Sequence, residues 1–462
     1  MTPKKQMNYL ATEFEQYTPQ FDLIKFGELE DVICIDGEPV EPDQDGYYHI
    51  NKNCSVKTYV CDGEYGSGIA RFELWLGEPD DTPEKQGEED NTGTRLYKNN
   101  EKHELYNWYN FDWDISDVKS GDYKVYAKAF DQAGNTKETY INVKIEAAGA
   151  IHNCLELQAM KDNLSGNYWL ANDIDCTYCT QDPGGALYNG GQGFDPIYFF
   201  TGTFDGKGHT ITGLKINRSV AYVGLFGRPT NTSEIKNVGL IDVNITGLTY
   251  TGGLVGTLGG KLKNCYTTGS VTGGGEVGGL VGRNWSSEDI ENCYSECNVY
   301  GGGSVGGLVG MHITGKITSC YATGNVSSAG GEIGGLVGTN WRYCPITNCY
   351  ATGAVSGNSK LGGLIGSLCY DNTLEKCYST GHVSGNQYVG GLIGLNYWNC
   401  PVNDSFWDTQ ISGTSYSPGG IGKTTVEMKL KATYTDWDFS SIWDIIEGDG
   451  INPETGTYPW LR

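Results

Sequence analysis

The sequence of 462 residues has no run of about 20 apolar residues, the length that a membrane-spanning helix needs. It is also poor in basic residues, with 32 Lys and Arg against 56 Asp and Glu. The net charge of −24 argues against nucleic acid as a partner and disfavours anionic membranes, because both carry phosphates that attract a basic face. We therefore expect neither a nucleic-acid partner nor direct membrane insertion.

A signal peptide is not evident in the numbered chain. Lys4 and Lys5 supply positive charge, but Glu13 and Glu15 follow where a signal peptide needs an apolar run. We interpret the chain as a mature or trimmed form. Its 15 cysteines would be unusual in a reducing cytosol, so we predict an extracellular or cell-surface location.

Catalytic and metal-binding signatures are also lacking. The six histidines show no metal-ligand spacing, so we assign surface or loop roles to His49, His103, His152, His209, His312 and His382. The repeats carry few acids, and no Asp recurs at one position. We therefore predict no catalytic residue, no metal and no cofactor.

Glycine is abundant, with 68 residues, and it recurs in a Gly-Gly-Leu-[Val/Ile]-Gly motif. After a first step of 26 residues the motif recurs every 28 residues, and its leucines are Leu254, Leu280, Leu308, Leu336, Leu364 and Leu392. Gly costs about 1 kcal/mol at each helical position, and the accompanying Val, Ile, Thr and Tyr favour strands. The period predicts stacked coils of three short strands and three turns.

An Asn-Cys-Tyr-like unit follows each of the first five motifs, and its cysteines are Cys265, Cys293, Cys320, Cys349 and Cys377. Together with Gly-Gly-Leu-Val-Gly, this unit resembles the GLUG repeats of bacterial and archaeal surface proteins, adhesins and the non-catalytic parts of secreted peptidases. The resemblance implies a β-helix and a surface location, but no single activity.

The first third of the chain has short alternating runs separated by Gly, Asp and Asn turns, which suggest a sandwich. Residues 66–76 and 120–135 resemble the Ig-like modules of secreted bacterial and archaeal proteins, which are usually spacers or display elements.

We accordingly predict an all-β chain, with an Ig-like β-sandwich followed by a right-handed parallel β-helix of about seven coils. The expected parts are an arm or first strand over 1–30, the sandwich over 31–147, an N-terminal cap over 148–217, the solenoid over 218–410 and a C-terminal cap over 411–462.

The recurring cysteines are expected to point inward as buried free thiols, because stacked neighbours about 4.8 Å apart are too distant for a disulfide. The other candidates for disulfides are Cys176 with Cys179, as a structural staple, and Cys369 with either Cys344 or Cys400.

Aromatic residues follow the motif in alternate coils, at Trp285, Trp341, Tyr397 and Trp398. This row has three interpretations: a sugar-stacking strip, a subunit contact, or packing of turns over a neighbouring coil.

Candidate glycosylation sites occur at Asn53, Asn163, Asn217, Asn231, Asn244, Asn284, Asn325 and Asn403.

The leading functional hypothesis is a non-enzymatic extracellular structural or adhesive protein, a self-assembling filament or surface-layer subunit. Its partners would then be copies of itself, or surface glycans and proteins. The alternatives are a glycan-binding module and a polysaccharide-active β-helix enzyme.

Overall fold

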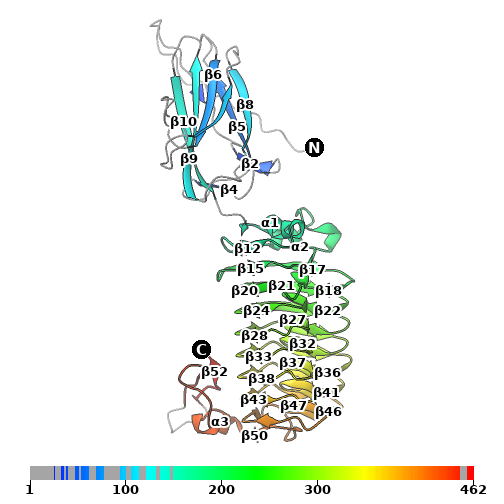
Figure 1. The fold of residues 1–462 in the computed structure, drawn as a ribbon. Coiled ribbons are helices and arrows are strands. Elements are labelled where there is room, and N and C mark those ends of the chain that lie inside the picture. The colour runs from blue at the N-terminus through cyan, green and yellow to red at the C-terminus, as the bar shows by residue number, and fades with distance from the viewer. Residues whose placement is uncertain are drawn as a thin grey trace. The chain divides into compact units, whose positions relative to one another are not determined.

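The computed structural model describes residues 149–447 and 455–462 and, within residues 1–148, ten strands between Lys25 and Ile145. The chain divides into two compact units, Met1–Ala148 and Gly149–Arg462 (Figure 1). Candidate site Asn53 and most of the expected arm over 1–30 lie outside the described residues.

The first unit holds two five-stranded sheets among its described residues. One runs in the order β1-β5-β2-β3, with β8 also beside β5, and the other in the order β4-β10-β9-β6-β7. Neighbours are antiparallel except for β4 and β10, which are parallel. The bounds are β1 (Lys25–Phe26), β2 (Ile33–Ile35), β3 (Glu38–Pro39), β4 (Tyr47–Ile50), β5 (Cys54–Cys61), β6 (Ile69–Leu76), β7 (Thr94–Asn99), β8 (Tyr106–Trp113), β9 (Gly121–Asp131) and β10 (Thr136–Ile145).

The second unit is a parallel β-solenoid whose coils pass through four sheets in turn (Figure 1). The seven-stranded sheet contains β18 (Ala221–Val223), β22 (Thr249–Gly252), β26 (Val277–Gly278), β31 (Val305–Gly306), β36 (Gly331–Gly334), β41 (Ser359–Gly362) and β46 (Gln387–Gly390). The eight-stranded sheet contains β14 (Ile197–Tyr198), β19 (Phe226–Arg228), β23 (Val255–Leu258), β27 (Val281–Asn284), β32 (Val309–His312), β37 (Val337–Asn340), β42 (Ile365–Leu368) and β47 (Ile393–Asn396).

The other two sheets complete each coil. The ten-stranded sheet contains β11 (Ala150–Ile151), β12 (Asn167–Leu170), β15 (Thr203–Asp205), β20 (Glu234–Lys236), β24 (Lys261–Lys263), β28 (Ile290–Glu291), β33 (Ile317–Thr318), β38 (Ile346–Thr347), β43 (Leu374–Glu375) and β48 (Val402–Asn403). The fifteen-stranded sheet contains β13 (Ile174–Asp175), β16 (Thr210–Thr212), β17 (Lys215–Asn217), β21 (Gly239–Thr246), β25 (Tyr266–Thr272), β29 (Tyr294–Ser295), β30 (Asn298–Gly301), β34 (Tyr321–Ala322), β35 (Val326–Ser328), β39 (Tyr350–Ala351), β40 (Val355–Ser356), β44 (Tyr378–Ser379), β45 (Val383–Ser384), β49 (Phe406–Asp408) and β50 (Ile421–Lys423).

The prediction of about seven coils of three strands was too low in both numbers. The solenoid has about eight turns, because the segment expected to be only a cap already supplies β14 and β15 to two of the sheets. A regular coil uses four sheets, and its path through the fifteen-stranded sheet breaks into two short strands, such as β29 and β30.

The paired glycines of the motif are required by the close approach of adjacent coils. Gly306 and Gly307 turn the chain from β31 into β32. A Cβ atom on Gly306 would collide with the carbonyl oxygens of Val309 in its own coil and Leu336 in the next coil, and one on Gly307 with that of Gly335 in the next coil. Any side chain here would therefore push two coils apart.

Columns of identical or similar side chains fill the interior. The six motif leucines are fully buried, together with Val and Ile residues of the eight-stranded sheet. Before each core cysteine stands a residue with left-handed backbone, such as Asn264 (φ 53°) and Asn292 (φ 51°), a conformation that Asn tolerates well. The Nδ2 atom of Asn292 donates to Oδ1 of Asn264 across the coils, at 3.2 Å.

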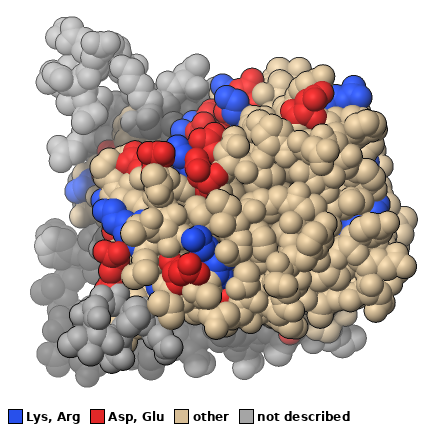
Figure 2. Space-filling model, turned by 90° about the horizontal axis from the view of Figure 1, so that it is seen from below, with Lys and Arg blue, Asp and Glu red and all other residues tan. Residues whose placement is uncertain are grey.

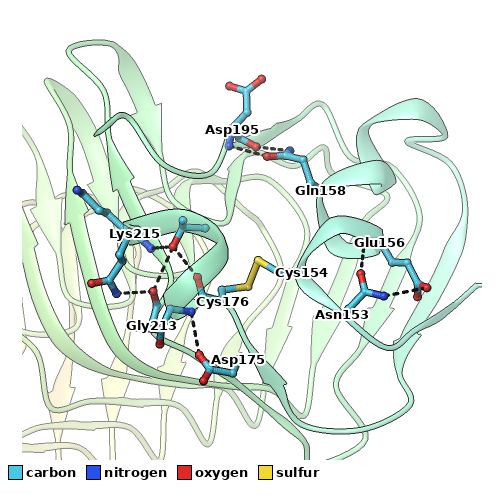
Figure 3. The surroundings of a disulfide bond; sticks show 12 residues. Asn153, Cys154, Glu156, Gln158, Asp175, Cys176, Asp195, Gly213 and Lys215 are labelled. Atoms are coloured by element: carbon cyan, nitrogen blue, oxygen red, sulfur yellow. Dashed lines mark hydrogen bonds between the residues drawn. A yellow bond between two sulfur atoms is a disulfide. The ribbon is translucent and has the colours of Figure 1, made fainter. Parts of the chain in front are cut away.

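A disulfide fastens the first coils. Cys154 begins α1 (Cys154–Ala159), Cys176 precedes α2 (Thr177–Gln181), and their sulfur atoms are bonded (Figure 3). Two 3₁₀ turns, η1 (Met160–Asp162) and η2 (Asn189–Gly191), complete this segment. The prediction that Cys176 pairs with Cys179 was wrong: Cys179 is a free thiol, and Cys154 lies across from Cys176 with a Cα–Cα distance of 5.4 Å.

The C-terminal segment folds back along the solenoid (Figure 1). It contains α3 (Thr425–Met428), η3 (Lys431–Thr433), β51 (Trp443–Asp444) and β52 (Trp460–Leu461). Its aromatic residues pack on a ladder of parallel tyrosine rings, where Trp443 lies 6.2 Å from Tyr350 and 6.1 Å from Tyr378. The segment thus covers the side of the last coils.

Several charged side chains of the solenoid form ion pairs with one another. Seen from the end that carries β47 and β50, the described surface is largely uncharged, and its charges gather in small mixed clusters (Figure 2). Lys263 Nζ lies 2.8 Å from Glu291 Oε2, and Lys360 Nζ lies 2.9 Å from Glu332 Oε1.

Candidate functional site

The candidate site lies where each coil turns from the eight-stranded sheet into the ten-stranded sheet. We call these turns corners, and the relevant ones span 285–289, 313–316, 341–345, 369–373 and 397–401. The hydrogen bonds from Trp285 N to Leu258 O and from Trp341 N to His312 O stack each corner on its predecessor. Equivalent positions therefore lie above one another at about 4.8 Å per coil.

Two buried asparagines and one half-buried asparagine hold the corners of the strip in place. Asn340 donates from Nδ2 to the carbonyl of Cys344 at 2.9 Å, and Asn396 donates to the carbonyl of Cys400 at 3.0 Å. Asn372 accepts from the backbone N–H of Cys344 at 2.6 Å. Because these amides fix the corner backbone, the outward side chains stand on a rigid platform.

Three successive corners join their aromatic rings into a strip formed by Trp341, Tyr370 and Trp398. The ring centroids of Trp341 and Tyr370 are 5.2 Å apart, and those of Tyr370 and Trp398 are 5.3 Å apart. The guanidinium of Arg342 lies 5.1 Å from the centre of the Tyr370 ring. Tyr370 thus connects the two indoles, which remain 39% and 62% exposed.

A groove of about 620 Å³ opens beside this strip. Its lining residues are Ser287, Asp289, Ile313, Thr314, Gly315, Lys316, Trp341, Arg342, Tyr343 and Pro345. The corner 313–316 has four residues, whereas 285–289 and 341–345 have five. The shorter corner therefore forms a recessed floor between two longer ones.

Tyr343 occupies a strained position on the wall of this groove. Its φ is 51°, and the equivalent residues of the next two corners are Asp371 (φ 49°) and Asn399 (φ 51°). Asp and Asn adopt this left-handed conformation far more readily than a bulky aromatic residue does. Tyr343 is nevertheless 66% exposed, so its ring is not held there by burial.

Three charged residues of the groove have no ion-pair partner. Within the described part of the chain, Lys316, Arg342 and Asp289 form no salt bridge. Elsewhere on the solenoid Arg283 is paired with Glu276, and Lys360 with Glu332. The charges of the groove are thus available to a ligand.

The structure places the four aromatic residues of the predicted row in different surroundings. It brings Trp341 and Trp398 into one strip through Tyr370. Trp285 is 60% exposed and makes no ring contact with any other described aromatic residue. Tyr397 points to other neighbours, since the Nζ atom of Lys360 lies 5.4 Å from its ring centre.

Sequence reasoning missed Tyr370, Arg342 and Tyr343. A signal for the groove was present, because the step from Cys293 to Cys320 is 27 residues while the motif leucines keep a step of 28. The missing residue falls in the corner 313–316, which forms the floor.

The five ladder cysteines are free and fully buried. Burial raises the pKa of Cys265, Cys293, Cys320 and Cys349 well above that of an exposed thiol. The predicted disulfide of Cys369 with Cys344 or Cys400 was wrong, because all three are buried free thiols. Asn372 takes the equivalent position in the coil between those of Cys344 and Cys400, and it accepts a hydrogen bond from the backbone of Cys344. Burial raises the pKa of Cys369 to about 12.

One of the candidate glycosylation sites is inaccessible. Asn284 is fully buried, and its Oδ1 accepts from the backbone N–H of Ser286 while its Nδ2 donates to the carbonyl of Thr314. A glycan cannot be attached to this side chain in the folded protein. The exposed candidates are Asn163, Asn217, Asn231, Asn244, Asn325 and Asn403.

His312 was expected on the surface but is fully buried, next to Asn284. Burial lowers its pKa to about 3. No group of three His, Cys, Asp or Glu side chains among the described residues is placed to hold a metal ion. None of the helices described has the length and apolar character needed to cross a membrane.

Comparison with known proteins identifies the repeats. Residues 273–300, 301–327 and 329–356 match the GLUG motif. These segments are GLUG repeats, and each forms one coil of the solenoid. The predicted GLUG-repeat β-helix is thereby confirmed, whereas the matches leave the Ig-like nature of residues 31–147 a prediction.

The GLUG-repeat chain also resembles halomucin from Haloquadratum walsbyi, with 38% identity over 177 residues. The match covers 36% of this chain and 2% of halomucin. Among solved structures, a candidate immunoglobulin A1 protease from Bacteroides ovatus has 22% identity and a TM-score of 0.46, covering 68% of this chain and 91% of that one. A second, titled IgA1 Protease, has 16% identity and a TM-score of 0.34, covering 74% and 28%. Likenesses this weak carry no argument about activity.

Proposed function

We propose that this protein is a non-enzymatic adhesive protein of the cell surface, and that its GLUG solenoid binds carbohydrate at the strip formed by Trp341, Tyr370 and Trp398. The observation that carries the proposal is the continuity of this strip over three coils, with ring-to-ring steps of 5.2 and 5.3 Å. The apolar faces of sugar rings pack well on exposed indole faces. Successive sugar units of a polysaccharide would then pack against successive rings of the strip.

The rigidity of the platform also favours binding. The backbone of each corner that carries the strip is hydrogen-bonded to Asn340, Asn372 or Asn396, so little conformational freedom is lost when a ligand binds. A strained, exposed Tyr343 at the groove has no evident role in folding.

The groove favours binding over hydrolysis. Most glycoside hydrolases use a pair of carboxyl groups, one on each side of the scissile bond. Of the ten residues that line this groove, Asp289 is the one acid. We therefore propose a non-catalytic site, and expect no product release from a panel of polysaccharides.

The surface location is supported by three observations. The repeats are GLUG repeats, part of the chain is 38% identical to halomucin, and Cys154 and Cys176 form a disulfide, which is typical of oxidising compartments. The proposed role of the Ig-like module over 31–147 is that of a spacer, and self-assembly into filaments remains a prediction.

The proposal is tested by binding to immobilised polysaccharides. Wild-type protein is compared with Trp341→Ala combined with Trp398→Ala, and with Tyr300→Ala as a control, because Tyr300 is 51% exposed on the fifteen-stranded sheet. We expect the double variant to lose binding and the control to keep it. Equal binding by all three proteins would refute the strip as the site.

A further inference from the structure

We infer that the groove selects anionic carbohydrate, a polymer that carries carboxylate or sulfate groups. This inference rests on the proposed function, because it assigns the class of ligand to the same site. It is carried by two unpaired cations, Lys316 on the floor of the groove and Arg342 on its wall.

Lys316 and Arg342 are two cations without an ion pair among the described residues, and they line the same groove. The chain has 24 more acidic than basic residues, so acids are plentiful. Lys236, Lys263 and Lys360 each have a carboxylate oxygen within 3.1 Å. Within the described residues Lys316 and Arg342 have none, although both stand in one groove.

Arg342 is placed where a stacked sugar would carry its charged group. Its guanidinium lies over Tyr370, the ring that connects Trp341 to Trp398. A guanidinium that stacks on a ring still presents N–H groups at its edges, and it recognises planar carboxylates and sulfates with paired hydrogen bonds. A sugar on either indole would bring its anionic substituent to these donors.

The acid of the groove constrains how such a polymer lies. Asp289 belongs to the corner 285–289, on the side of the floor opposite Trp341. It would repel an anion there and accept hydrogen bonds from sugar hydroxyls. The negative substituents would then face Lys316 and Arg342, and the hydroxyl-bearing edge would face Asp289.

Local cations are needed because the protein as a whole repels anions. With a net charge of −24, a polyanion gains nothing from long-range attraction. Binding should thus depend on short-range contacts that salt weakens only partly, since the Debye length at physiological salt is about 8 Å.

The test uses two matched pairs of polymers, measured by isothermal titration calorimetry. Polygalacturonate is compared with its methyl-esterified form, and dextran sulfate with dextran. The proteins are the full chain, Lys316→Gln combined with Arg342→Gln, and Trp341→Ala. We expect wild type to bind at least one charged polymer about tenfold more tightly than its neutral counterpart. Preference for polygalacturonate would identify the anion as a carboxylate, and preference for dextran sulfate as a sulfate.

The variants separate this inference from the proposed function. The double Gln variant should bind charged and neutral polymers equally, while Trp341→Ala should weaken the binding of both. If wild type binds the neutral polymers as tightly as the charged ones, the inference fails and the proposed function stands. If wild type binds none of the four, both fail. A double Gln variant that keeps the tenfold preference would also overturn the assignment to Lys316 and Arg342.

Discussion

The indole of Trp398 stacks on the phenol ring of Tyr370 from the preceding coil, with ring centroids 5.3 Å apart and planes inclined by 28°. Tyr370 also meets Trp341 edge-on, so one partly buried ring supports the two exposed indoles. The strip therefore depends on a residue that offers little of its own surface to a ligand.

Replacing Tyr370 by Ala should consequently impair binding without removing either indole. Each ring contact contributes about 0.5–1.5 kcal/mol, so stability should also fall by about 1–3 kcal/mol. Tyr370→Phe keeps the ring and serves as the matched control. Urea unfolding and polysaccharide binding check both effects; if Tyr370→Ala binds as wild type does, the support role is wrong.

Tyr343→Asn should stabilise the protein while weakening binding. Asn relieves the left-handed backbone at φ 51°, as it does at Asn399, and a gain of about 1 kcal/mol is expected. Binding should weaken because the exposed ring is lost from the groove. A variant that is more stable and binds normally would show that Tyr343 has no part in the site.

His312 should make the solenoid sensitive to acid. Burial lowers its folded pKa to about 3, against 6.5 for an exposed histidine. Between these values the unfolded chain takes up a proton that the folded chain excludes. The contribution of neutral His312 to the free energy of unfolding is thus fully present above pH 6.5. It falls by about 1.4 kcal/mol per pH unit as the pH drops toward 3.

The control for this prediction is His312→Asn, because Asn284 and Asn340 occupy the same position in the neighbouring coils. Unfolding free energies of both proteins are measured from pH 7.5 to pH 4. As the pH falls, the free energy of unfolding of the variant should rise relative to that of the wild type. A difference that is independent of pH would contradict the assignment.

Removing the disulfide should loosen the first coils. The bond closes a loop with a sequence separation of 22, so Cys154→Ser combined with Cys176→Ser should lose about 3 kcal/mol. Cys179→Ser should change little, because Cys179 is a free thiol. If Cys179→Ser proved as destabilising as the double variant, the pairing would have to involve Cys179.

Much of the solenoid could be predicted from its period alone. Leu280, Leu308 and Leu336 recur at equal spacing, and a strand-rich repeat of this length must stack its equivalent residues. Counting motifs gave too few turns, because the coil that contains β14 lacks the motif. Its strand β14 nevertheless pairs with β19 of the next coil.

The site was harder to predict because it arises from departures from the repeat. Tyr370 follows Cys369 in a corner that looked unrelated to Trp341, and the two meet only when consecutive coils are stacked. The groove exists because one corner is a residue shorter. The pairing of Cys154 with Cys176 likewise depends on how the chain folds between them, which spacing cannot reveal.

Fluorine NMR of protein labelled with 5-fluorotryptophan would show whether the strip of Trp341, Tyr370 and Trp398 contacts carbohydrate. The 11 tryptophan signals are assigned by single substitutions and followed as polysaccharide is added. We expect saturable shifts for Trp341 and Trp398, while the signal of Trp285 stays unchanged although its side chain is more exposed than that of Trp341. If the signals of Trp341 and Trp398 do not shift at saturating polymer, or if Trp285 shifts equally, carbohydrate does not bind at the strip.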